Sequence, residues 1–177
     1  MNLEFGSEYD EFTSKVEAFC KEYSGATITT NDKKFEMHDA LSGNVSSSKG
    51  KSVGRSEWQK ILIEKGYFAR SIPKEYGGHG GEPDIIKSRI IAGAFAKYKV
   101  PNAMGGQGID MLVPTLLEWG TEDQKQQHIE STLLGETIWC QGYSEPNAGS
   151  DLASLQTKGE LIDCLLYTSD AADDWWG

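Results

Sequence analysis

The segment Ser144–Asp151 carries the residue types of a loop that binds a cofactor. An apolar and aromatic run, Ile138–Tyr143, stops at a stretch rich in Pro, Asn, Gly and Ser, and this change predicts a strand that ends in a loop. Such a loop presents backbone N–H groups together with the hydroxyls of Ser144 and Ser150. These groups suit the rim of a flat cofactor or a phosphate. The alternative is an ordinary surface turn, since Pro-Asn and Gly-Ser pairs are common in loops.

Two further motifs favour the cofactor loop over the surface turn. Ile72–Gly78 reads Ile-Pro-Lys-Glu-Tyr-Gly-Gly, and Trp119–Lys125 reads Trp-Gly-Thr-Glu-Asp-Gln-Lys. Together with Gly142–Leu155, these segments resemble three motifs of the acyl-CoA dehydrogenase family in the same order along the chain. Tyr143 departs from the aliphatic residue that is commonest at its position in that family. The resemblance extends from residue 1 to about residue 163.

The resemblance implies a mainly α fold, with an acyl-CoA dehydrogenase-like N-terminal helical domain followed by the first strand and loop of a truncated β-barrel domain. In that family the order along the chain is helical domain, β barrel and helical bundle. We therefore expect residues 1–136 to form the helical domain and residues 137–163 to begin the middle β domain.

The resemblance also implies the chemistry of an FAD-dependent acyl-CoA dehydrogenase, an oxidoreductase of lipid breakdown. In that family a carboxylate takes the α proton of an acyl-CoA thioester and flavin N5 takes the β hydride. Fixed backbone donors stabilise the negative charge that develops on the flavin. The family's general base lies far downstream, so we expect no catalytic residue in this chain and no activity from it alone. The residues expected to contact FAD are Gln141, Gly142, Tyr143, Ser144, Glu145, Pro146, Asn147, Ala148, Gly149 and Ser150.

Individual residues of the loop have different implied roles. By the family pattern, Ser144 lies near the pyrimidine end of the flavin, and Ser150 reaches the cofactor pyrophosphate or the pantetheine of the substrate. Glu145 is interpreted as a residue that fixes the loop and not as the catalytic carboxylate. Asp151 is expected to cap the turn by accepting backbone N–H bonds.

Several apolar residues near the loop have two interpretations. Trp139 and Tyr143 are flavin neighbours or, as we favour for aromatic residues in a strand, core residues. Ile109, Met111 and Leu112 line an acyl pocket or simply pack their helix, and we favour packing. The glycines of Gly105–Gly108 begin that helix and would widen a pocket, but no acyl length follows from them.

The implied partners are an acyl-CoA substrate and electron-transfer flavoprotein as the electron acceptor, and the full-length parent is expected to be a homo-oligomer, either a dimer or a tetramer. Two alternatives remain open. The first is an acyl-CoA oxidase-type relative that passes electrons to oxygen. The second is a non-catalytic subunit of a heteromeric acyl-CoA dehydrogenase. The retained Ser144 and Ser150 argue against the second, because a subunit that does not bind flavin has little need of them.

Composition argues against several other classes of protein. The formal charge of −10 disfavours nucleic-acid binding, which relies on clustered Lys and Arg. No apolar run approaches the roughly 20 residues that span a bilayer, and the first residues lack the pattern of a signal or transit peptide. A cytoplasmic location is therefore the default expectation. The three cysteines and three histidines lack the spacing of a zinc site or a disulfide framework, so we expect no metal.

Residues 164–177 do not continue the family pattern. Back-translated, Cys164–Asp174 resembles read-through into a transposase sequencing adapter. We therefore expect a non-native tail and assign it no fold. On this interpretation the chain is an N-terminal fragment of a longer protein.

Helical periodicity governs the first half of the helical domain. Ser7 is expected to cap a first helix that buries apolar residues up to Tyr23. Asp32–Leu41 is expected to form a short helix and Ser42–Gly54 a mobile loop. Ser56 is expected to cap the next helix, which runs over Glu57–Lys65 and ends at a glycine.

The second half of the domain is expected to contain three more helices. Pro83 is placed at the first position of a central helix that runs to about Tyr98. A helix over Gly105–Glu118 is expected to kink at Pro114. Thr121 and Gln124 predict a capping box for a final helix to about Leu133, which Gly135 closes.

Overall fold

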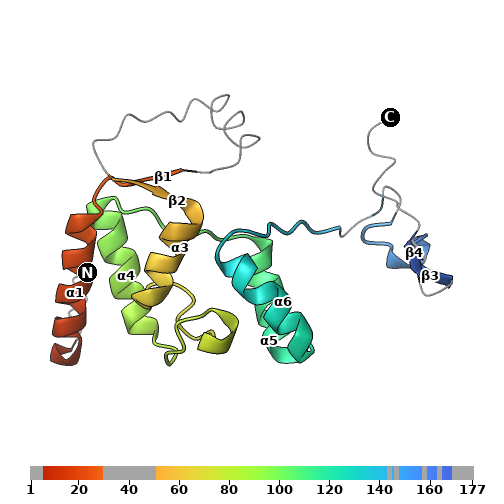
Figure 1. Ribbon diagram of the computed structural model, residues 1–177, viewed down its shortest axis with the longest axis horizontal. Coiled ribbons are helices and arrows are strands. Elements are labelled where there is room, and N and C mark those ends of the chain that lie inside the picture. The colour runs from red at the N-terminus through yellow and green to blue at the C-terminus, as the bar shows by residue number, and fades with distance from the viewer. Residues whose placement is uncertain are drawn as a thin grey trace. The chain divides into compact units, whose positions relative to one another are not determined.

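The computed structural model describes residues 6–29, 51–142, 145, 148–156, 159–162 and 165–168 (Figure 1). The chain divides into two compact units, one that ends at Trp139 and one that begins at Cys140. The first unit is mainly helical, which confirms the predicted fold class. Its helices are α1 (Asp10–Glu22), α3 (Arg55–Glu64), α4 (Ile85–Tyr98), α5 (Val113–Trp119) and α6 (Glu122–Leu133).

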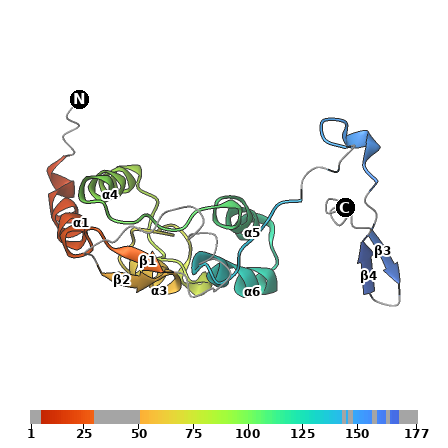
Figure 2. The ribbon, with the colours of Figure 1, turned by 90° about the horizontal axis from the view of Figure 1, so that it is seen from above.

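The helices α1, α3 and α4 enclose the first hydrophobic core of this unit, as both ribbon views show (Figure 1, Figure 2). The predicted apolar face of α1 is confirmed, since Val16, Phe19 and Cys20 are buried. The ring of Phe19 stacks between Trp58 of α3 and Phe95 of α4, with centroid separations of 5.9 and 6.0 Å. Stacked aromatic rings contribute beyond the apolar area that they bury, so this cluster binds the three helices together.

A second core joins α5 and α6, which lie side by side in both views (Figure 1, Figure 2). Val113 of α5 packs with Ile129 and Leu133 of α6, and all three are buried. Tyr76 closes the cluster from a short 3-10 turn, Lys74–Tyr76. These buried side chains hold α5, α6 and the short turn together.

Two predicted helix caps differ from the structure. Ser7 does not cap α1, because it opens a 3-10 turn, Ser7–Tyr9, and the α-helix begins only after this turn. Ser56 lies inside α3, which begins at Arg55 directly after extended backbone. The Ser56 hydroxyl instead donates to the carboxylate of Glu136 at 3.2 Å, so it is engaged elsewhere.

The start of α4 also lies two residues later than predicted. Asp84 is the N-cap, and its carboxylate accepts the backbone N–H groups of Ile86 at 3.0 Å and Lys87 at 2.9 Å. These bonds satisfy two of the donors that a helix start leaves without partners. Pro83 precedes the cap and is not the first helical residue. The stronger hydrogen-bond acceptor therefore sets the boundary.

The capping box of α6 is confirmed in both of its bonds. The Gln124 N–H donates to the Thr121 hydroxyl at 3.3 Å, and the Thr121 N–H donates to the Gln124 side-chain oxygen at 2.9 Å. The predicted closing residue Gly135 adopts φ +70°, a conformation that glycine takes at little cost.

The predicted disturbance at Pro114 takes the form of a π-helical turn. Gly108–Leu112 is π-helical, and the N–H after this turn reaches back five residues before α5 continues. Proline has no N–H and would clash with the carbonyl of Asp110 in a regular α-helix. A wider turn accommodates the ring, and such turns occur frequently at functional sites.

The loop predicted over Ser42–Gly54 is wrong at its end, where the structure has a strand. β2 (Ser52–Gly54) pairs in parallel with β1 (Thr27–Thr29), with Ile28 opposite Val53. Val53 is buried while Ser52 is exposed, an alternation typical of a strand with one covered face. The short helix predicted at Asp32–Leu41 lies outside the described residues.

The second unit contains a short antiparallel hairpin of β3 (Gly159–Ile162) and β4 (Leu165–Thr168). All of β4 lies within residues 164–177, for which the sequence predicts no fold. The strand predicted over Ile138–Tyr143 is wrong for residues 138–142, which have no regular secondary structure. A strand requires a hydrogen-bonded neighbour, and no described strand pairs with this segment.

Within the described ranges, every helix is too short or too polar to cross a membrane. The same part of the chain contains no group of three or more His, Cys, Asp or Glu side chains that could hold a metal ion.

Candidate functional site

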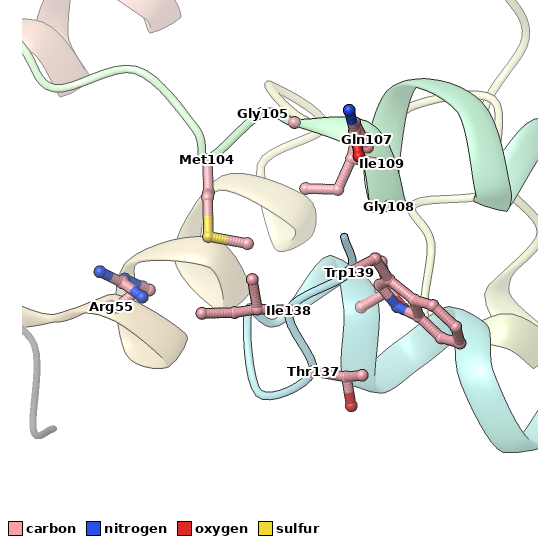
Figure 3. A pocket seen from close by; sticks show the side chains of 11 residues that line it. Arg55, Met104, Gly105, Gln107, Gly108, Ile109, Thr137, Ile138 and Trp139 are labelled. Atoms are coloured by element: carbon pink, nitrogen blue, oxygen red, sulfur yellow. The ribbon is translucent and has the colours of Figure 1, made fainter. Parts of the chain in front are cut away.

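A pocket of about 290 Å³ opens in the first unit between the start of α3, the segment before α5 and the chain that leaves α6 (Figure 3). Met104–Ile109 forms one side, and Ile138 with Trp139 forms another. Among the lining residues Arg55 carries the charge, and none is a carboxylate, an imidazole or a thiol. This volume is close to the lower end of the roughly 300–1,000 Å³ of small-molecule sites. The lining suits binding of an apolar group better than proton transfer.

The glycines before α5 keep this side of the pocket free of side chains. Gly106 adopts φ +122°, which favours glycine, and its N–H donates to the Asp110 carboxylate at 3.0 Å. A β-carbon on Gly108 would lie 2.6 Å from Cδ1 of Trp139, so the indole packs directly on the backbone there. The expectation that these glycines widen a pocket agrees with this geometry.

The π-turn decides which apolar side chains of this helix reach a pocket. Ile109 lines the pocket of Figure 3, as the sequence analysis allowed. Met111 is 52% exposed, and neither it nor Leu112 lines this pocket. Of the three residues, Ile109 therefore lines the pocket, whereas the sequence favoured helix packing for all three.

The indole of Trp139 is held by a buried hydroxyl. Its Nε1–H donates to Oγ1 of Thr132 at 2.8 Å, and that hydroxyl donates to the carbonyl of His128 at 2.6 Å. The His128 and Trp139 rings also meet edge to face at 5.4 Å. Trp139 thus packs against α6, in agreement with the core interpretation, while one side of it faces the pocket.

Gln59 holds the pocket lining in place through two hydrogen bonds. The sequence itself contains no sign of this role. Its amide donates to the carbonyl of Leu133 at 2.9 Å and accepts the N–H of Met104 at 2.9 Å. The side chain is only 1% exposed. It thereby fixes the start of the glycine segment to α3 and α6. Nothing in the sequence separates this glutamine from an exposed helical one.

The motif Ile72–Gly78 and the motif Trp119–Lys125 contact each other. The Tyr76 hydroxyl donates to both carboxylate oxygens of Glu122, at 2.9 and 3.0 Å. This hydrogen bond raises the pKa of Tyr76 to about 12. Gly77 follows with φ +81°, and a β-carbon there would lie 2.7 Å from the Glu130 side chain. These motifs therefore hold the short turn against α6.

The signature loop lies in the second unit, where its described residues form a tight closure. The N–H and carbonyl of Glu145 exchange hydrogen bonds with those of Ala148, at 3.1 and 3.2 Å. The Glu145 carboxylate accepts the N–H of Gln156 at 2.8 Å. This bond is one that a loop-fixing residue would make, and the role of Glu145 stays a prediction.

Other predicted residues of the loop differ in how the structure places them. Gln141, Gly142, Gly149 and Ser150 are exposed, whereas Ala148 is buried. A glycine at an exposed bend lets a planar ring or a phosphate approach the backbone closely, so Gly149 with Ser150 fits a flat cofactor or its phosphates. The predicted contacts Tyr143, Ser144, Pro146 and Asn147 lie outside the described residues.

Asp151 contributes to the loop through its backbone. Its carbonyl accepts both the N–H of Ser154 at 3.3 Å and the Ser154 hydroxyl at 2.9 Å. The sequence predicts instead that the Asp151 carboxylate accepts backbone N–H groups. Among the described residues, both of these bonds go to the Asp151 carbonyl oxygen, because the chain after it turns into a 3-10 helix, Leu152–Ser154.

Known proteins with similar sequences share a domain with this chain. Residues 7–136 match the acyl-CoA dehydrogenase N-terminal domain. Acyl-CoA dehydrogenase IpdE1 of Mycolicibacterium smegmatis is 33% identical over 122 residues, which cover 69% of this chain and 31% of that protein. Acyl-CoA dehydrogenase FadE34 of Mycobacterium tuberculosis is 39% identical over 129 residues, which cover 67% of this chain and 17% of that protein.

A solved structure supports the same fold. A chain of the ChsE4-ChsE5 complex from Mycobacterium tuberculosis superposes with a TM-score of 0.50 and 26% identity. The match covers 90% of this chain and 36% of the other. This chain therefore spans about a third or less of the length of these relatives.

Proposed function

The chain belongs to the acyl-CoA dehydrogenase family, and on this basis we propose that it is the N-terminal part of an FAD-dependent enzyme that dehydrogenates an acyl-CoA thioester between its α and β carbons. One observation carries the proposal. An apolar, glycine-walled pocket ends at Ile138 and Trp139, and the chain runs from there into the signature loop. A hydrophobic cavity and a cofactor loop are the two parts that such a reaction requires.

In this proposal the loop holds FAD through Gln141–Ser150. When bound, the flavin supplies the acceptor for the β hydride. The exposed bend at Gly149 and Ser150 would approach the cofactor, with Ser150 also within the region of the substrate's pantetheine. Glu145 keeps the loop closed through its bond to Gln156. Fixed donors of this kind stabilise developing charge without reorganising.

The pocket is proposed to take the acyl chain. Its apolar lining by Met104, Ile109 and Ile138 removes hydrocarbon from water, at about 25 cal/mol per Å² of buried apolar surface. The glycine wall adds width without adding polar groups that would need partners. We propose that the carboxylate that removes the α proton lies outside these 177 residues, as the family resemblance implies, and the lining of this pocket contains no carboxylate.

The electron acceptor and the assembly are part of the same proposal. We propose electron-transfer flavoprotein as the acceptor and a dimer or tetramer of identical chains for the whole protein. Oxygen as the acceptor would identify an oxidase-type relative instead. An assembly with a different, flavin-binding subunit would identify a heteromer, an arrangement that the complex of the similar ChsE4-ChsE5 structure makes worth testing.

The test uses the full-length protein, of which this chain is proposed to be the N-terminal part, and the 177-residue chain, both purified in the same way. The longer protein is expected to carry the yellow absorbance of bound flavin and to reduce a ferricenium acceptor when an acyl-CoA is added. The 177-residue chain is expected to show neither property. A longer protein without flavin and without turnover contradicts the proposal. Peroxide formation in place of ferricenium reduction would select the oxidase.

A further inference from the structure

The hydroxyl of Thr132 is the point at which α6 and the pocket wall meet. Thr132 is 1% exposed, whereas its two hydrogen-bond partners are half-buried. It donates to the carbonyl of His128 at 2.6 Å and accepts the indole N–H of Trp139 at 2.8 Å. The Thr132 hydroxyl has one hydrogen, which it donates to the His128 carbonyl. Its oxygen therefore acts toward the Trp139 indole only as an acceptor.

The indole is confined on two further sides. Gly108 of the π-turn lies against its edge so closely that no β-carbon would fit, and the same β-carbon would meet the Thr132 methyl at 2.9 Å. The His128 ring packs against it edge to face, with an interplanar angle of 86°. One polar bond and two packing contacts thus define a single orientation of the Trp139 ring.

The orientation of Trp139 also sets the place of its neighbour. Ile138 precedes it and lines the pocket, and Figure 3 shows its side chain below that of Met104, between Arg55 and Trp139. Ile138 is 59% exposed, so its own packing does little to fix it. The half-buried indole, held by its bond to Thr132, therefore supplies the anchor for this part of the wall.

We propose that Thr132 is a positioning residue and Trp139 a specificity-determining residue of the acyl pocket, because the Thr132–Trp139 bond fixes the wall that the acyl group meets. The inference rests on the proposed function and deepens it. The substrate class follows from the geometry. Because the Thr132–Trp139 bond fixes the Trp139 side of the pocket, this side has one shape. The pocket therefore discriminates between straight and branched acyl chains with the same number of carbons.

The first test follows the bond itself in the 177-residue chain. The indole N–H signal of Trp139 is identified in a ¹H–¹⁵N spectrum as the one lost in Trp139→Phe. Thr132→Val removes the acceptor at nearly constant volume and is expected to speed exchange of this proton by about tenfold or more, because a lost bond of this kind costs about 1–3 kcal/mol. Thr132→Ser keeps the hydroxyl and is expected to restore slow exchange.

The second test measures selectivity between acyl-CoA substrates in the full-length protein with flavin bound. Thr132→Val and Trp139→Phe are expected to change the ratio of KM for butyryl-CoA to KM for isobutyryl-CoA by about fivefold or more. Thr132→Ser is expected to keep the wild-type ratio. Thr115→Val is the matched control, since Thr115 makes the same backward bond, to the Met111 carbonyl at 2.8 Å, on an exposed face outside the pocket.

The outcomes separate the two proposals. Wild-type protein without acyl-CoA turnover refutes the proposed function and this inference with it. Normal wild-type turnover with unchanged KM ratios in both Thr132→Val and Trp139→Phe refutes the inference alone. Loss of thermal stability in Thr132→Val with an unchanged KM ratio also refutes it, because the bond would then be purely structural.

Discussion

At the scale of single residues, Tyr76 couples stability to alkaline pH. Its pKa is raised from 10.0 to about 12, first by the hydrogen bond to the Glu122 carboxylate. A pKa that is higher in the folded state means that the folded protein holds this proton more tightly, so the contribution to stability is complete below pH 10 and is lost toward pH 12. Tyr76→Phe is therefore expected to lower Tm at neutral pH, with a difference from wild type that shrinks over that window.

Thermal unfolding at a series of pH values checks this prediction. Glu122→Gln is the informative companion, because a neutral acceptor keeps a hydrogen bond but removes the charge that raises the tyrosine pKa. This variant is expected to shift the loss of stability to lower pH. A Tyr76→Phe difference that stays constant up to pH 12 would contradict the assignment.

Gln59 is expected to be among the most sensitive polar positions. Gln59→Leu leaves the Leu133 carbonyl and the Met104 N–H without their partner in a buried site. Each of the two unsatisfied groups costs about 1–3 kcal/mol, so the free energy of unfolding should fall by roughly 2–6 kcal/mol. Urea denaturation measures the loss. Gln127→Leu, at an exposed position of α6, is the control and should change stability by less than about 0.5 kcal/mol.

Gln59 and Thr132 show why part of the site could not be predicted from the sequence. Both are polar residues on helices whose other polar residues face solvent. Their burial depends on which helices pack together, and periodicity within one helix does not contain that information. Trp139 was more accessible to prediction, because a large aromatic residue in an apolar run favours the core. The hydroxyl that orients it was not.

At the scale of elements, the capping box of α6 allows a direct test. Thr121→Ala removes the acceptor of the Gln124 N–H and is expected to lower the free energy of unfolding by about 0.5–2 kcal/mol. Thr121→Ser should retain most of the stability, since serine caps as well as threonine. Equilibrium denaturation followed by circular dichroism measures both. Equal stability of the alanine and serine variants would contradict a role for the cap.

Helices were predicted better than strands for a physical reason. The apolar faces of α1, α4 and α6 repeat with the helical period, and a helix satisfies its backbone within one segment. The pairing of β1 with β2 joins segments that lie 25 residues apart in register, such as Thr27 and Ser52. No local pattern encodes such a pairing. Residues 138–142 show the converse, because a strand-like composition gives no sheet where no described strand pairs with it.

At the scale of the whole molecule, the first unit is expected to carry the stability of the chain. Both hydrophobic cores lie between Val16 and Leu134, and the compact unit ends at Trp139. A chain that ends at Trp139 is therefore expected to unfold with a Tm within a few degrees of the 177-residue chain. Differential scanning calorimetry of the two chains measures this.

A second truncation serves as the control for that comparison. A chain that ends at Gly120 lacks α6, and with it Ile129 and Leu133 of the second core. It is expected to lose cooperative unfolding, since removing large buried side chains costs several kcal/mol each. A markedly lower Tm for the chain ending at Trp139 would instead show that the second unit stabilises the first.

The parallel pairing of β1 and β2 has a consequence for engineering. Because Thr29 pairs with Gly54 and Thr27 with Ser52, the chain between the strands starts and returns at points only a strand's length apart. Closing a longer connection between fixed ends costs only about 0.6 kcal/mol for each doubling of its length. A tag or reporter domain inserted between Thr29 and Lys51 is therefore expected to add little to the entropic cost of folding, since the ends of the connection stay fixed by the strand pairing.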